Sequence, residues 1–297
     1  MTDKEQEETL GLPINTVVCF STAKGKFNKR VMKRQLKTLE PLVAILKQFL
    51  QPDETILLAV KGRSPVSMVE AMSTGWVIYY ARRCALVVTS TRILHIPTRA
   101  NLRPKKSIAE VGYGDIATLK FRSFLGRGLA LTYKSGKRET FSSIPSGDFK
   151  KLKVVLEARP KECPASEAGE RRHLCPKCMS LLRKDRYVCA TCRLEFKDRR
   201  QAVRRALLLP GGGWFYTGYP LLGVLYGLVE VLLVADIMLS LGEIVAGLGG
   251  EERWFQIILS GGLLALEKSL AVLHARRSVE DYLPVSQDFV PIKSHAR

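Results

Sequence analysis

Four cysteines form two closely spaced pairs in the second half of the chain. Cys175 and Cys178 enclose Pro-Lys, Cys189 and Cys192 enclose Ala-Thr, and ten residues separate the two pairs. A tetrahedral Zn²⁺ takes four thiolates, and each C-x-x-C turn supplies two of them. Because four thiolates leave no open coordination position, the spacing predicts a structural zinc site and not a catalytic one.

A disulfide bond and a redox-active dithiol are the rival uses of such cysteines. Residues 1–8 are polar and acidic and lack the basic and apolar regions of a secretory signal, so we expect the cysteines to stay in the reducing cytoplasm. A redox dithiol needs one pair in a thioredoxin-like context, whereas this chain has two pairs. His173, just before the first pair, is expected to be a bystander. Cys19, Cys84 and Cys163 are isolated, and we expect free thiols.

The segment from Cys175 to Phe196 resembles the zinc-ribbon family, in which Cys-Pro-x-Cys, a polar hairpin and Cys-x-x-Cys-x-x-x-Phe follow one another. The resemblance implies a metal-stabilised module over residues 175–198. Many zinc ribbons bind nucleic acid, and the neighbourhood of these cysteines is basic. Aromatic stacking faces are few, because Tyr187 stands almost alone and Phe196 is expected in the ribbon's core. Nucleic-acid binding is therefore an alternative that the residues do not favour.

The most apolar part of the chain follows these cysteines. Residues 206–250 contain neither lysine nor arginine, and a second apolar run over 254–273 follows the short polar turn Glu251-Glu252-Arg253. Two such runs with a tight link predict a helical hairpin that spans a membrane twice. Basic residues flank the hairpin on both sides while its loop is acidic, so we expect both termini on the cytoplasmic side of the inner membrane. A soluble helical hairpin is the alternative.

Charged and small residues inside the predicted spans have a helical spacing. Gly223 and Gly227 form a G-x-x-x-G step, and Glu230 continues the same face. We expect Glu230 to pair with Lys268 of the second span, because the pair spares both groups an unpaired charge in hydrocarbon. The Gly223/Gly227 face would also suit contact with a second copy of the chain. Intramembrane acids also occur in transport proteins, so a subunit of an oligomeric transporter or channel is an alternative function.

The stretch Leu209-Pro-Gly-Gly-Gly-Trp-Phe-Tyr-Thr-Gly218 resembles the glycine-aromatic start of TM2-like membrane hairpins. The charged residues that those families often carry near this motif are absent here, so the resemblance implies the topology alone. We expect the glycines to turn the backbone at the membrane interface. Trp214, Phe215 and Tyr216 are then expected in the headgroup belt.

The first half of the chain has the pattern of a small β-rich domain. A helical period over residues 39–49 ends before Pro52. Short strands are then expected at 55–60, 76–80, 86–88, 93–96, 116–119, 129–133 and 140–141. An amphipathic helix is expected over 146–156, with Phe149, Leu152 and either Val155 or Leu156 on one face. Several strands followed by one such helix predict a small curved sheet closed by a C-terminal helix.

Two short motifs within this region resemble the bacterial PH-like and GRAM-like families. A T-x-x-R hairpin, Thr89 to Arg92, precedes a Y-x-D-I strand start, Tyr113 to Ile116. The resemblance implies a lipid- or protein-binding module over residues 39–160, without catalysis. Basic residues at the predicted strand ends and loops are candidates for contact with an anionic lipid headgroup. They are Lys61, Arg63, Arg82, Arg83, Arg103, Lys105 and Lys106.

The charge of the whole chain agrees with an anionic partner. The formal net charge is +19 and the pI is about 9.8, which favours nucleic acid or the anionic cytoplasmic face of a membrane. Solubility combined with the positive-inside bias is the alternative explanation. The sequence shows no acid pair, nucleophile–base set or phosphate loop, so we do not expect an enzyme.

Together these observations predict a multi-domain α+β membrane protein. Its expected parts are an acidic tail and basic segment (1–38), a PH-like domain (39–160), a linker (161–174), a zinc ribbon (175–198), a two-span membrane hairpin (199–277) and a cytoplasmic tail (278–297). The expected function is that of a membrane-anchored, non-enzymatic binding or adaptor protein at the cytoplasmic membrane face. Its expected partners are anionic membrane lipid and a further protein.

Overall fold

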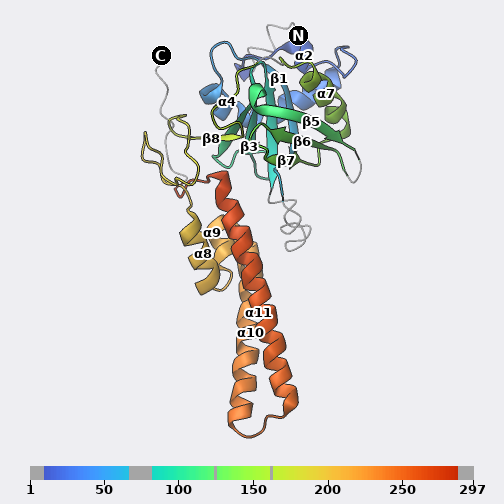
Figure 1. The fold of residues 1–297 in the computed structure, drawn as a ribbon. Coiled ribbons are helices and arrows are strands. Elements are labelled where there is room, and N and C mark those ends of the chain that lie inside the picture. The colour runs from blue at the N-terminus through green and yellow to red at the C-terminus, as the bar shows by residue number, and fades with distance from the viewer. Residues whose placement is uncertain (1–9, 67–81, 124–125, 161–162, 287–297) are drawn as a thin grey trace. The chain divides into compact units, whose positions relative to one another are not determined.

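The computed structural model describes residues 10–66, 82–123, 126–160 and 163–286, which divide into two units (Figure 1). The first, the β-domain, comprises Met1–Glu195 and Ser286–Arg297, and the second, the helical unit, comprises Phe196–Val285. The predicted α+β class is confirmed: the β-domain contains antiparallel sheets, and the helical unit contains two long apolar helices. The strand expected at 76–80 lies outside the described residues.

A five-stranded antiparallel sheet forms the centre of the β-domain. Its order is β1 (Ile56–Arg63), β2 (Arg83–Thr89), β3 (Arg92–Pro97), β4 (Ile108–Gly112) and β8 (Arg172–Leu174). Successive residues point to opposite faces, so Leu58 and Val60 enter one apolar cluster and Ala59 enters the other. Both faces are covered, which explains why β2 and β3 are apolar almost without interruption.

A second sheet and a helix cover one face. The strands β5 (Ile116–Arg122), β6 (Gly128–Tyr133) and β7 (Arg138–Phe141) form an antiparallel sheet, and α7 (Ser146–Glu157) follows them. Leu152 and Leu156 of α7 are fully buried in the cluster between the sheets. The helix predicted over 146–156 is therefore present and closes the domain.

Helices before the first strand cover the other face of the large sheet. These are α2 (Thr16–Cys19), α3 (Lys29–Leu39), η1 (Glu40–Leu42) and α4 (Val43–Phe49). Leu12 and Ile14 are buried in the same cluster, and Gln35 accepts a 2.9 Å hydrogen bond from the amide of Ala59. Lys151 of α7 donates to the carbonyls of Cys19 and Ser21. The described residues 10–38 are thus part of the β-domain, although the sequence pattern placed them outside it.

Of the segment expected to be a linker, 161–174, the described residues 163–174 are also held against the domain. The amide of Ser166 donates a 2.6 Å hydrogen bond to Asp115. A side chain at Gly114 would collide with the carbonyl oxygen of Pro164. The segment ends in β8, which pairs with β4. Its polar composition suggested a linker, but long-range pairing along the sheet edge decides its structure.

The T-x-x-R motif organises a buried ion network at the β2–β3 turn. Thr89 Oγ1 accepts from the amide of Arg92 and donates to Glu54 at 2.6 Å. The guanidinium of Arg92 forms two hydrogen bonds to Glu54, of 2.8 and 2.9 Å, and an ion pair with Glu110. Arg172 of β8 contacts Glu110 at 2.8 Å. The motif therefore positions structural elements. Tyr113 of the Y-x-D-I motif joins the same turn, since its hydroxyl donates to the carbonyl of Thr89.

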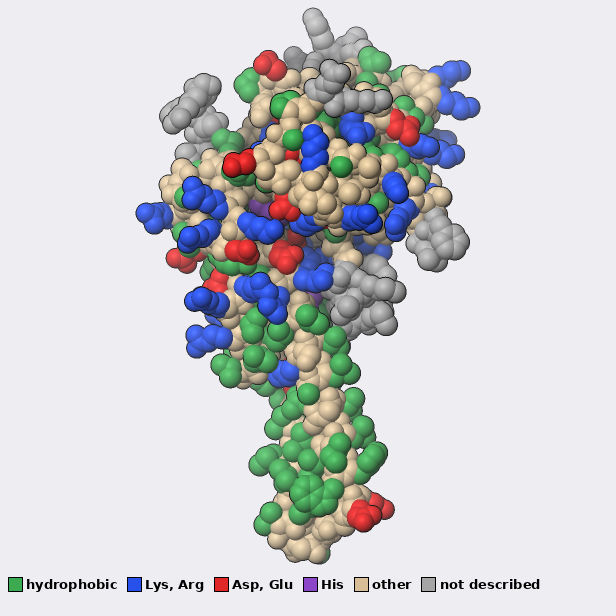
Figure 2. All heavy atoms as spheres, viewed as in Figure 1, with side chains coloured by type: hydrophobic (Ala, Val, Ile, Leu, Met, Phe, Trp, Pro, Cys, Tyr) green, Lys and Arg blue, Asp and Glu red, His purple; other side chains and the backbone are tan. Residues whose placement is uncertain are grey.

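The helical unit consists of two short helices and a long hairpin (Figure 1). The short helices are α8 (Arg199–Leu208) and α9 (Gly212–Thr217); the hairpin is α10 (Pro220–Val245) and α11 (Glu251–Ser278), followed by η3 (Val279–Asp281). Both long helices are long and apolar enough to cross a membrane. Hydrophobic side chains cover their visible surface in Figure 2. Those on α10 that are more than half exposed include Leu221, Val224, Leu225, Leu228, Leu232, Met238 and Leu239.

Candidate functional site

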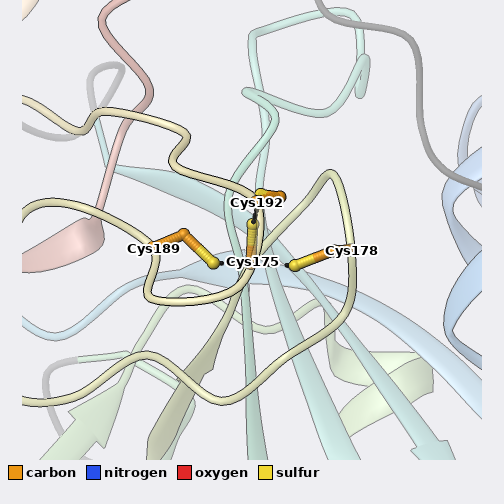
Figure 3. A group of neighbouring side chains, drawn as sticks. All are labelled: Cys175, Cys178, Cys189 and Cys192. Atoms are coloured by element: carbon orange, nitrogen blue, oxygen red, sulfur yellow. Dashed lines mark hydrogen bonds between the residues drawn. The ribbon is translucent and has the colours of Figure 1, made fainter.

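The two cysteine pairs lie in two turns whose thiols point toward one another (Figure 3). The two turns have the same backbone hydrogen bonds. In each turn the amide of the first cysteine, Cys175 or Cys189, donates to the carbonyl five residues later, at 2.9 Å in both cases. The amide four residues later donates back to the carbonyl of that cysteine, at 2.9 and 3.1 Å. The residue after the second cysteine is left-handed in both turns, with φ of 63° at Met179 and 58° at Arg193. Two equivalent turns therefore present two thiols each.

The four sulfur atoms converge on one point. All lie within 4.8 Å of one another, with 3.5 Å between Cys175 and Cys192 and 3.6 Å between Cys178 and Cys189. A tetrahedral Zn²⁺ with Zn–S bonds of about 2.3 Å sets its sulfurs about 3.8 Å apart. The cluster therefore fits the predicted four-cysteine metal site, and the metal would be held without an open position for substrate.

The surroundings of the sulfurs favour thiolate at one position. Burial raises the pKa of Cys189, but hydrogen bonds from Ser180 and from the backbone amides of Cys192 and Thr191 outweigh burial and lower its pKa to about 6. Ser180 Oγ lies 3.2 Å from this sulfur and 3.1 Å from that of Cys178. Metal binding requires deprotonated cysteines. Burial raises the pKa of Cys175 and of Cys192, so these hydrogen-bond donors favour the thiolate at Cys189 alone.

The cysteine cluster is joined to the β-domain directly. Strand β8 ends at Leu174, one residue before the first cysteine, and Leu174 is buried in the domain's core. Gln48 of α4 donates a 3.0 Å hydrogen bond to the carbonyl of Pro176 within the first turn. The ring of His173 is not among the four grouped ligand atoms, which agrees with its expected role as a bystander. The cysteine cluster therefore borders the sheet and is not a separate module on a linker.

The candidate lipid-binding residues lie on β1, at the start of β2 and in the β3–β4 connection, and Arg82, which directly precedes β2, is buried. They are Lys61, Arg63, Arg82, Arg83, Arg103, Lys105 and Lys106. Arg63 and Arg83 are cross-strand partners, and Arg83 donates to the carbonyl of Ala100 in the connection that also carries Arg103. The structure thus brings most of this set to one end of the large sheet. Lys61 lies further inside β1, opposite Ala85.

In the helical unit, the predicted charged pair is in contact. Lys268 Nζ lies 2.7 Å from Glu230 Oε2, and Glu230 is 2% exposed. The same ammonium group donates to the carbonyls of Ala206 at 3.0 Å and Leu209 at 3.4 Å. Glu230 also accepts from the amide of Gly211 at 3.2 Å. The sequence pattern indicated the pair but not its contact with the α8–α9 turn.

The Gly223/Gly227 face was expected to contact a second copy of the chain. In the structure it packs against another segment of the same chain. A side chain at Gly223 would collide with the ring of Phe215, and one at Gly227 would press on Pro210. The α8–α9 turn of the same chain therefore covers this face. The sequence gives no simple signal for this, because a G-x-x-x-G step indicates close packing without naming the partner.

The aromatic residues of α9 only partly follow the expected headgroup belt. Phe215 is exposed, but Trp214 is 3% and Tyr216 is 7% exposed. The Trp214 ring stacks on His274, with centroids 4.0 Å apart, and on Tyr226 at 5.0 Å. The belt prediction is wrong for Trp214 and Tyr216, because they pack inside the helical unit.

A second polar network lies near the hairpin loop, and the sequence pattern did not predict that its residues contact one another. Asp236 of α10 accepts hydrogen bonds from Gln256 and Ser260 of α11, both at 2.6 Å. Arg253 contacts both Gln256, at 2.9 Å, and Glu243, at 2.5 Å. The signal was present in the spacing, because Gln256 and Ser260 are one helical turn apart. Paired polar groups thus hold the two long helices together at two levels.

The chain was compared with protein-family models, curated proteins and solved structures. No family model matches it, and no curated protein or solved structure matches it.

Proposed function

We propose that this chain is a membrane-anchored, non-enzymatic binding protein that holds a PH-like domain and a structural zinc ribbon at the cytoplasmic face of the inner membrane. The observation that carries the proposal is the inside-out pattern of the long hairpin. Its apolar side chains point outward, while Glu230, Asp236 and Ser260 lie between the helices. An apolar surface of this extent is a liability in water and a requirement in hydrocarbon.

The element order of the β-domain supports the PH-like part of the proposal. Antiparallel strands β1 to β7 are followed by one amphipathic helix, α7, which packs against them. This is the arrangement that the T-x-x-R and Y-x-D-I motifs imply by resemblance. The two motifs meet in space, since the hydroxyl of Tyr113 reaches the carbonyl of Thr89.

A structural role for the metal is supported by the number and position of its ligands. Four cysteines fill the tetrahedron, and the first of them directly follows an edge strand of the sheet. Bound Zn²⁺ would tie the two turns together, and the residues beyond them, to that edge.

A buried serine–histidine contact supports a non-enzymatic reading. Ser64 Oγ lies 2.8 Å from His95 Nε2, as in a nucleophile–base pair. However, His95 Nδ1 lies 2.7 Å from the guanidinium of Arg171, which can only donate. Nδ1 is therefore the acceptor, Nε2 carries the hydrogen, and His95 cannot take a proton from Ser64. The histidine is also 1% exposed, so the contact is structural.

The basic end of the large sheet is the proposed contact with anionic lipid. Arg63, Arg83 and Arg103 converge there from two strands and one connection. Clustered cations near a membrane gain about 1 kcal/mol each from anionic lipid. A further protein partner is also part of the proposal, and its identity would come from crosslinking in membranes.

The proposal is tested with the full chain in nanodiscs. Hydrogen exchange of residues 97–106 is measured in phosphatidylcholine discs and in discs that also contain phosphatidylglycerol. We expect slower exchange with the anionic lipid, and we expect Arg103→Glu to abolish the difference. Arg138→Glu, an exposed arginine on β7, is the matched control and should retain it. Equal exchange in both discs would overturn the lipid contact. Failure of the chain to enter discs would overturn the membrane anchor.

A further inference from the structure

The chain reverses direction between α8 and α9 beside the first half of α10. The reversal occurs at Pro210-Gly211, where Gly211 has φ of 63°. A side chain at Gly211 would collide with the carbonyl oxygen of Gly223. Glycine is therefore required twice, once for the backbone conformation and once for the close approach to α10.

The ion pair forms hydrogen bonds to backbone groups on both sides of this reversal. The last carbonyls of a helix have no partner within it and normally turn to water. Here Lys268 donates to the carbonyls of Ala206 and Leu209, at 3.0 and 3.4 Å. On the other side of the turn, the amide of Gly211 donates to Glu230. Protein side chains thus take the place of water at both ends of the turn.

The level of the turn along the hairpin follows from its backbone contacts with α10. Gly211 lies against Gly223 and Pro210 lies against Gly227, three and seven positions after Pro220, where α10 begins, which corresponds to about 5 and 10 Å along the helix axis. The hydrocarbon core of a bilayer is about 30 Å thick. If the first turn of α10 lies at the edge of that core, the turn at Gly211 lies below the headgroups, within the third of the core nearest that edge.

The outer surface of the turn is apolar. Leu207, Leu208 and Leu209 are 52%, 72% and 54% exposed, and Phe215 of α9 is 47% exposed. These side chains continue the apolar surface of the hairpin, on which Leu225 and Leu228 are also more than half exposed. The arginines of α8 precede this surface in the chain. Because helical side chains lean toward the helix N-terminus, Arg204 and Arg205 lean away from the leucines.

We propose that the α8–α9 segment is a re-entrant membrane element, which enters the hydrocarbon beside the hairpin and returns to the same side. Lipid acyl chains cover Leu207, Leu208, Leu209 and Phe215. The inference rests on the proposed function, in that α10 and α11 span the bilayer. Non-helical backbone is tolerated at membrane depth only where protein satisfies its polar groups. Lys268 and Glu230 provide that condition here.

The test compares two tryptophan substitutions in the reconstituted full chain. Leu208→Trp reports on the turn, and Leu232→Trp, at an exposed apolar position of α10, reports on the hairpin. Emission is measured in phosphatidylcholine with brominated acyl chains and in unbrominated lipid, as the difference from the unsubstituted chain. We expect both tryptophans to lose a similar fraction of their emission to the bromines. Aqueous iodide should quench neither.

The outcomes separate this inference from the proposed function. Bromine quenching of Leu232→Trp without quenching of Leu208→Trp would overturn the re-entrant element and leave the membrane hairpin intact. Absence of quenching in both would overturn the hairpin's membrane placement and the inference with it. If Leu208→Trp does not fold, Leu207→Trp makes the same comparison at the neighbouring exposed position.

Discussion

Lys268 of α11 and Glu230 of α10 form an ion pair of 2.7 Å that fixes a third element, the α8–α9 turn. The lysine donates to carbonyls of Ala206 and Leu209, and the glutamate accepts from the amide of Gly211. Two charges in an apolar setting are costly unless both are paired and hydrogen-bonded. In this chain the same two side chains meet that requirement and hold the packing of three helices.

Removal of one partner should therefore destabilise the helical unit strongly. We expect Glu230→Gln or Lys268→Met to lower the free energy of unfolding by about 3 kcal/mol each, because each leaves an uncompensated charge or unpaired backbone groups. The double variant should recover part of the loss, although the carbonyls of Ala206 and Leu209 stay without the lysine. The measurement is thermal unfolding of the full chain in detergent micelles, followed by circular dichroism.

A matched control is the ion pair near the hairpin loop. Glu243 and Arg253 are both about 40% exposed at their side chains, so Glu243→Gln should cost less than about 1 kcal/mol. Equal losses for Glu230→Gln and Glu243→Gln, or a double variant that loses the sum of both single effects, would contradict the role given to the pair.

Metal removal should affect the β-domain beyond the cysteine turns. We expect one Zn²⁺ per chain, measured by elemental analysis, and loss of that metal in Cys189→Ser. Because β8 leads directly into Cys175, loss of the metal should also expose the edge of the large sheet. Faster hydrogen exchange in β4 and β8 after chelation would show this. Cys163→Ser, a thiol outside the cluster, is the control and should keep both metal and protection. A chain that binds no metal would contradict the prediction.

The repeated turn geometry gives a prediction at Arg193. This residue is exposed and has φ of 58°, in the left-handed region that favours glycine. We expect Arg193→Gly to stabilise the metal-loaded domain by roughly 0.5–1 kcal/mol, whereas the β-branched Arg193→Val should destabilise it. Thermal unfolding of the zinc-loaded protein compares the two variants. Equal thermal stability of the Arg193→Gly and Arg193→Val variants would show that backbone conformation does not matter at this position.

The sequence predicted the structure best where the spacing of nearby residues determines which side chains meet. The cysteine spacing states the ligand set, and helical spacing placed Glu230 and Lys268 where they can meet. It predicted the structure poorly where contact with a segment distant in the chain determines burial or conformation. Leu12 and Ile14 are buried only because the large sheet has an uncovered face, and Ser166 is held by Asp115, 51 residues away in the chain.

The Gly223/Gly227 step shows the same limit. Its small residues predict a close neighbour, but Pro210 and Gly211 become that neighbour only through the reversal between α8 and α9. In the same way, Trp214 has the type of a headgroup-belt residue, yet it stacks on His274 of α11. Residue type indicates what a position tolerates, and the tertiary arrangement decides what it contacts.

Arg92 tests the structural role of the T-x-x-R motif. Its guanidinium contacts Glu54 by two hydrogen bonds and also pairs with Glu110. We expect Arg92→Met to cost about 3–5 kcal/mol, because it leaves the buried carboxylate of Glu54 without its guanidinium partner. Arg92→Lys should also destabilise the domain, since an ammonium group cannot reproduce the planar fork. Arg138→Lys, an exposed arginine on β7, is the control in chemical denaturation. A near-neutral Arg92→Lys would contradict the argument.

His95 should make the stability of the β-domain depend on pH. Burial, followed by the charges of Arg171, His173 and Arg82, holds the pKa of His95 well below its ordinary value of 6.5. The unfolded chain therefore binds a proton near pH 6.5 that the folded chain does not bind. The contribution of His95 is fully present above that pH and is lost progressively below it. At pH 5.5 the loss from this residue is about 1 kcal/mol.

Chemical denaturation at pH 7.5 and pH 5.5 measures this loss, with His95→Gln as the matched variant. Glutamine does not titrate, so the variant should be less stable at pH 7.5, where the contacts with Ser64 and Arg171 are altered. Its change in stability between the two pH values should be smaller than that of the unsubstituted chain by about 1 kcal/mol. An equal change in both proteins would mean that His95 takes up its proton in the folded state, which the adjacent guanidinium of Arg171 opposes.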